Sequence, residues 1–149
     1  MLFWEDFRPG EAVEIGQHTF TEGEIVAFAR EFDPQPFHTD PEAARSSFYG
    51  GLIASGWHTC AVAMRLMVQA YIGRAASAGS PGVENIRWTG PVRPGDTIRY
   101  RRVILEARPS ERRPDIGLVR SRTEAVNQRE ETVMTMEGWG FFRRRPPAA

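Results

Sequence analysis

The chain has 149 residues, the length of one domain that can bury a core of its own. Nineteen basic side chains balance nineteen acidic ones, which argues against nucleic acid or an anionic membrane as the main partner. All the basic residues are arginine, so lysine Schiff-base chemistry is excluded. The single cysteine, Cys60, excludes an internal disulfide and a multi-cysteine zinc site.

The beginning of the chain is apolar but does not have the order of a secretory signal, and no later segment is long and apolar enough to cross a membrane. We therefore expect a cytoplasmic protein. Residues 1–10 contain Leu2, Phe3 and Trp4, and we expect this segment to pack on a surface or on a partner chain.

The first third of the chain predicts one strand and two short helices. Residues 12–20 alternate loosely, which is typical of a strand. Thr21 and Glu24 match a capping box that begins a helix over about 22–31. The prolines in residues 33–38 argue against both a helix and a central strand there. Asp40 can cap a second short helix that ends near Ser46.

Residues 55–71 predict one long helix that is apolar on nearly all sides. Only His58, Arg65 and Gln69 form a narrow polar stripe along it. A helix of this kind is buried nearly all round, so we expect a wide element to wrap it.

The second half of the chain has no helical period and predicts four strands. These cover residues 83–89, 96–107, 116–127 and 132–143. Long antiparallel strands of this kind form a curved sheet. We expect a single α+β domain over residues 1–149, in which the sheet wraps the long helix, with residues 143–149 as a frayed end.

The pair most suited to acid–base chemistry is Asp33 and His38, in the proline-stiffened loop. A carboxylate and an imidazole held close together can share one water molecule and remove its proton. The alternative is that Asp33 is an ordinary loop residue after a helix and His38 an ordinary surface histidine.

The second candidate feature is the start of the long helix at Ser55 and Gly56. The first amides of a helix lack internal partners, and a glycine lets a carbonyl oxygen approach them, as an oxyanion site requires. The alternative is that Ser55 is only a helix cap and Gly56 a packing choice. Nearby, we expect His58 to be a satisfied interior histidine, and Trp57 either flanks the pocket or packs in the core.

Two stretches, residues 32–40 and 48–59, resemble the MaoC-like dehydratases, relatives of the (R)-specific enoyl-CoA hydratases. Residues 91–97 are similar to a turn between two strands in that family, and the resemblance extends over residues 13–142. It implies the hotdog fold, a curved antiparallel sheet wrapped around one long helix.

The resemblance implies that Asp33 and His38 are the catalytic pair that activates water, and that the Gly56 amide polarises the thioester carbonyl. The reaction would be the hydration of a trans-2-enoyl thioester or the reverse dehydration. Gln35, Ser55 and Trp57 are expected to contact the substrate. The family implies an acyl-CoA substrate, a homodimer or higher homo-oligomer, and no metal or redox cofactor.

The sequence departs from the family pattern at three positions. Gln35 stands where the hydratases usually have Asn, Ser55 where they usually have His, and Met64 where some have Ser. These departures suggest a dehydratase subgroup. Two alternatives stay open: a hotdog thioesterase, against which the absence of Asp and Glu in residues 56–71 counts, and a non-catalytic acyl-CoA-binding subunit.

Overall fold

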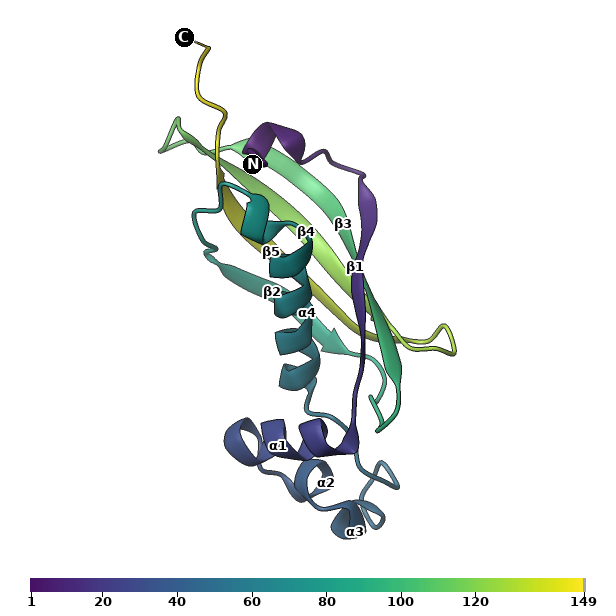
Figure 1. The fold of residues 1–149 in the computed structure, drawn as a ribbon. Coiled ribbons are helices and arrows are strands. Elements are labelled where there is room, and N and C mark those ends of the chain that lie inside the picture. Colours follow the sequence, from purple (N-terminus) through teal and green to yellow (C-terminus); the bar gives the residue numbers. More distant parts are fainter. Residues whose placement is uncertain (149) are drawn as a thin grey trace.

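The computed structural model describes residues 1–148 and has one antiparallel sheet that curves around one long helix, α4 (Gly56–Ala70) (Figure 1). The five strands lie in the order β1-β3-β4-β5-β2. Their bounds are β1 (Ala12–Thr19), β2 (Gly82–Trp88), β3 (Thr97–Pro109), β4 (Ile116–Val126) and β5 (Thr132–Arg143). The predicted α+β architecture is confirmed.

Three short helices, α1 (Glu22–Phe32), α2 (Pro36–Thr39) and α3 (Pro41–Ala44), gather beyond the N-terminal end of α4 (Figure 1). The predicted capping box of α1 makes one of its two hydrogen bonds. Thr21 accepts the amide of Glu24, while the Glu24 carboxylate contacts His18 instead. Asp40 caps α3 as predicted. Two single turns of 3-10 helix, Trp4–Asp6 and Ile72–Arg74, complete the elements.

The prediction that residues 33–38 contain no helix is wrong. Pro36 is the first residue of α2, where its missing N–H costs nothing because the first amides of a helix have no internal partner. Pro36 therefore begins the helical turn that carries His38, and the prolines do not prevent this turn from forming.

The prediction that α4 is buried nearly all round is also wrong for the single chain. Its inner side, with Val62, Ala63 and Leu66, packs into the core under the sheet. On the outer side Trp57 is 55% exposed and Met64 47% exposed. The sheet covers one side of the helix only, so an apolar stripe stays uncovered.

The two ends of the chain pack together beside the sheet. Trp4 donates from its indole to the carbonyl of Leu118, which agrees with the expected packing of the first residues. Arg143 ends β5, and the Arg145 guanidinium pairs with Asp6 at 2.9 Å. The predicted fraying is therefore wrong for residues 143–145.

Candidate active site

Asp33 and His38 are brought together by the junction of α1 and α2. Asp33 follows the last residue of α1, and its amide donates to the carbonyl of Ala29. His38 is buried in α2, and its Nε2 lies 3.2 Å from Oδ2 of Asp33. The contact predicted from the loop is therefore present.

The other ring nitrogen of His38 determines how the imidazole can act. Nδ1 lies 2.7 Å from the carbonyl oxygen of Ile53, so it carries the hydrogen that this acceptor requires. A neutral ring then turns a lone pair toward Asp33, whereas an imidazolium donates to it. The pair is thus arranged to pass one proton between nitrogen and oxygen.

Two neutral donors complete the surroundings of the Asp33 carboxylate. The Ser55 hydroxyl donates to Oδ2 and the Gln35 amide donates to Oδ1, each at 2.7 Å. Partial burial raises the pKa of Asp33, but the hydrogen bonds from Ser55 and Gln35 and the neighbouring His38 outweigh it, so the pKa lies below the usual 3.8. The carboxyl group is therefore ionised at neutral pH.

The N-terminal end of α4 begins directly beside this pair. Ser55 is the N-cap, and its Oγ accepts the amide of Trp57 at 3.3 Å. Among residues 1–148 the Gly56 amide has no hydrogen-bond partner. A β-carbon at Gly56 would collide with the indole of Trp88, so only glycine fits under this ring. The predicted oxyanion donor thus follows the residue that contacts Asp33.

Trp57 packs against Trp88 at the outer side of the helix. Its indole is mostly exposed and meets Trp88 edge-on, with 5.1 Å between the ring centroids. The contacts with substrate expected for Trp57, Gln35 and Ser55 stay predictions. Sequence reasoning missed Trp88, because no local pattern connects a residue at the end of a strand with a glycine in a distant helix.

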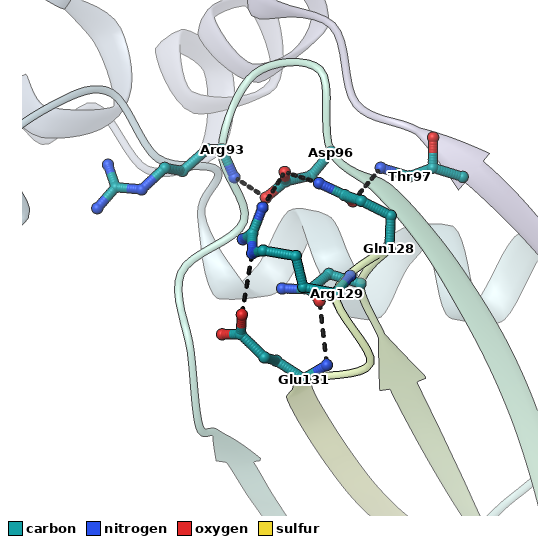
Figure 2. A network of polar contacts seen from close by, with 7 residues as sticks. Arg93, Asp96, Thr97, Gln128, Arg129 and Glu131 are labelled. Atoms are coloured by element: carbon teal, nitrogen blue, oxygen red, sulfur yellow. Dashed lines mark hydrogen bonds and ion pairs between the residues drawn. The ribbon is translucent and has the colours of Figure 1, made fainter.

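A polar turn between β2 and β3 is organised around the buried Asp96 (Figure 2). Asp96 accepts the backbone amide of Arg93 at 2.9 Å and the side-chain amide of Gln128 at 2.8 Å. The guanidinium of Arg93 in turn donates to the carbonyl of Tyr49. The carbonyl of the preceding residue, Val92, accepts the amide of Ala54, which lies immediately before the cap of α4. Residues 91–97, the turn that resembles the family pattern, therefore hold in place the chain that enters α4.

His58 is an interior residue, as predicted, but its ring is not satisfied. It stacks on Phe28 with 4.7 Å between centroids, and Nε2 lies 3.9 Å from a carboxylate oxygen of Glu24. Nδ1 is buried and has no hydrogen-bond partner within residues 1–148. Burial lowers the pKa of His58 to about 4, against the opposing charge of Glu24, so the ring is neutral at neutral pH.

An apolar cavity of about 280 Å³ lies between the second half of α4 and the sheet. Residues that line it include Met64, Met67, Tyr71, Val119, Ser121 and Met136. At 1.5 Å per residue, Met64 stands about 12 Å along the helix axis from Gly56. The cavity therefore lies along the same helix as the Gly56 amide, about two turns further on.

Two kinds of feature are absent from the described residues. No group of three or more His, Cys, Asp or Glu side chains in residues 1–148 could hold a metal ion. In the same part of the chain, no helix has both the length and the apolar character needed to span a membrane. The cytoplasmic location stays a prediction.

Residues 6–127 match the MaoC like domain, and the chain belongs to this family. The crystal structure of a MaoC-like dehydratase from Rhodospirillum rubrum superposes with a TM-score of 0.90 and 42% identity, over 99% of this chain and 100% of that one. The predicted family and the hotdog fold are confirmed.

Two curated relatives are also similar. The uncharacterized protein YdeM of Bacillus subtilis is 28% identical over 134 residues, which cover 89% of this chain and 93% of YdeM. The 3-hydroxyacyl-thioester dehydratase Z of Mycobacterium tuberculosis is 32% identical over 99 residues, 63% of this chain and 66% of that protein.

Proposed function

We propose that the protein is a hydro-lyase that adds water to a trans-2-enoyl-CoA and removes it from an (R)-3-hydroxyacyl-CoA. The observation that supports this most strongly is the contact of the ionised Asp33 carboxylate with the His38 imidazole beside the free Gly56 amide. Membership of a family of dehydratases supports the same reaction, because hydration and dehydration are two directions of one equilibrium.

The reaction needs a base for water, a proton for the α-carbon and stabilisation of the thioester oxygen. In the hydration direction the Asp33–His38 pair removes a proton from water, whose oxygen bonds to the β-carbon. The electrons of the double bond move toward the carbonyl, and the Gly56 amide stabilises the enolate-like oxygen. The pair then returns a proton to the α-carbon, so that one molecule of water has been added in total.

The apolar cavity is our candidate for the acyl chain. It is lined by α4 beyond the oxyanion donor, and its walls are mostly hydrocarbon and thioether groups such as Met67, Val119 and Met136. An apolar cavity with a few polar groups at its entrance is the usual form of a site for such a substrate. The CoA part would stay outside it as the handle of the substrate.

We also propose a homodimer in which a second copy covers the outer side of α4. Trp57, Met64 and Val68 on this helix are exposed, as are Val83 and Trp88 on the edge strand β2. Exposed apolar patches of this kind are typical of protein contacts. Sedimentation of the purified protein tests the assembly, and a monomer at micromolar concentration would contradict it.

The test of the reaction uses crotonyl-CoA and trans-2-octenoyl-CoA with the wild-type chain. Hydration is followed by loss of the enoyl thioester absorbance and by chromatography of the product, and thiol release is measured in parallel. We expect (R)-3-hydroxyacyl-CoA without release of thiol. Thiol release without hydration would indicate a thioesterase, and tight acyl-CoA binding without turnover would indicate a binding subunit.

A further inference from the structure

We infer that Ser55 and Gln35 are positioning residues that hold the Asp33 carboxylate in one orientation, and that the buried Ser55 does not contact the acyl-CoA. The catalytic consequence of this inference rests on the proposed hydratase function. Both residues stand where the chain departs from the usual family pattern, and for both the sequence analysis expects contact with the substrate.

The Ser55 side chain is shielded from solvent and already binds two groups of the protein. Its side chain is completely buried, its one hydroxyl hydrogen goes to Oδ2 of Asp33, and its oxygen accepts the amide of Trp57. The same hydroxyl therefore caps α4 and holds the carboxylate. It links the free N-terminal end of the helix to Asp33 through one atom.

Gln35 holds the opposite oxygen of the carboxylate. Its side-chain amide donates to Oδ1 at 2.7 Å, two residues along the chain, while its backbone carbonyl accepts the amide of His38. Because Ser55 and Gln35 bind different oxygens, the carboxylate plane cannot turn without breaking one of the two bonds. Gln35 and Ser55 together therefore hold both oxygens of the Asp33 carboxylate.

The occupied positions indicate where water binds. An ionised carboxylate has about four acceptor sites: Ser55 and Gln35 donate to two of them, and a third on Oδ2 faces Nε2 of His38, which donates to it as an imidazolium. Two of the three are on Oδ2, so the remaining site is on Oδ1. A water molecule that loses its proton to Asp33 would therefore approach Oδ1.

His38 on α2 is the titratable residue that faces the carboxylate; from the start of α4 only the uncharged Ser55 does so. A change in the titration of Asp33 after substitution of Ser55 or Gln35 therefore reports on these two donors. A residue that only stabilised the fold would not produce such a change.

The direct test is a carbon-13 NMR titration of the Asp33 carboxyl group in the free protein, assigned with Asp33→Asn. We expect Ser55→Ala and Gln35→Leu to move the midpoint to higher pH, because each removes a donor to the anion. Ser55→Thr should restore the midpoint. Ser47→Ala is the matched control, since that hydroxyl binds a backbone carbonyl outside the site.

Kinetics with crotonyl-CoA add a second measurement. We expect Ser55→Ala to lower kcat about 10- to 100-fold with KM nearly unchanged, because hydrogen bonds to charged groups have this magnitude. An unmoved midpoint together with a raised KM would overturn the inference and indicate contact with substrate. Gln35→Leu leaves the cap of α4 intact and keeps the test decisive if Ser55→Ala does not fold.

The two proposals fail in different ways. If the wild-type chain hydrates no enoyl-CoA while the midpoints move as expected, the proposed function is wrong and the positioning stands. If hydration proceeds while both substitutions leave the Asp33 midpoint in place, the positioning is wrong and the proposed function stands.

Discussion

The two ends of α4 differ in character although one helix carries both. At its N-terminal end Ser55 donates a hydrogen bond to Asp33, whose Oδ2 lies 3.2 Å from Nε2 of His38. Its second half presents Met67 and Tyr71 to an apolar cavity with few polar groups. One end brings a carboxylate, an imidazole and a hydroxyl together, and the other faces a mostly apolar cavity.

This difference follows from the helix itself. The first amides of a helix have no internal acceptor, so backbone groups are available to a ligand only at the tip. Two turns further on every amide is paired within the helix, and only side chains such as Met64 and Met67 can face a ligand. Substitutions at the two ends should therefore change chemistry and chain specificity separately.

The largest expected effect is at the polar end. His38→Gln should lower kcat/KM for crotonyl-CoA about 100- to 10,000-fold, the usual contribution of a group that transfers a proton. His18→Gln is the control, because His18 contacts Glu24 and Arg65 and not the catalytic pair. An equal loss in both variants would show that the effect is one of folding.

The next prediction concerns how the stability of the fold depends on pH through the interior residue His58. In the folded protein the pKa of His58 is about 4, below the ordinary 6.5. As the pH falls from 6.5 to 4, the unfolded chain therefore protonates this imidazole before the folded protein does, which favours unfolding. Full stability is present above pH 6.5, and about 3 kcal/mol of it is lost by pH 4. Urea unfolding at both pH values should show a smaller loss in His58→Leu. The same loss in both proteins would contradict the assignment.

Packing at the helix tip gives a third comparison. Gly56→Ala should lower the free energy of unfolding by about 1–3 kcal/mol, because the new methyl group overlaps the Trp88 indole. Gly23→Ala in α1 meets open space and should raise it by up to ~1 kcal/mol. Thermal or urea unfolding measures both, and Trp88→Ala should relieve the cost at Gly56. If Gly56→Ala is neutral, the ring does not lie where we describe it.

The smallest expected effect is at the apolar end. Ser121→Phe adds a ring to the cavity wall and should lower kcat/KM for trans-2-octenoyl-CoA by about tenfold, a usual size for steric discrimination in an apolar pocket. Activity on crotonyl-CoA should stay within about threefold. An equal decrease for both substrates would argue that the acyl chain does not enter this cavity.

The elements were predictable because their signals are local. The apolar spacing and the cap at Ser55 predict α4, and alternation predicts β4 and β5 to within a residue or two. The Asp33–His38 contact was predictable for the same reason, since the two residues are five positions apart in a segment that contains two prolines.

What the sequence could not indicate depends on residues far apart in the chain. Ser55 and Asp33 are 22 positions apart in the chain, and no periodic pattern in the sequence predicts the hydrogen bond between them. The indole of Trp88 over Gly56 and the support of the Tyr49 carbonyl by Arg93 are likewise set by how the sheet meets the loops. The exposure of the outer side of α4 could not be predicted for a similar reason. An apolar helix face is compatible with coverage by the sheet of the same chain or by a second chain.

The most direct test of the account compares Asp33→Asn with Asp115→Asn in the steady-state hydration of crotonyl-CoA at neutral pH. Asp115 is a surface carboxylate paired with Arg113, so its substitution controls for loss of charge. We predict that Asp33→Asn loses at least about 100-fold in kcat and keeps a folded circular dichroism spectrum, while Asp115→Asn retains wild-type activity. Hydration by Asp33→Asn at the wild-type rate would contradict the central claim.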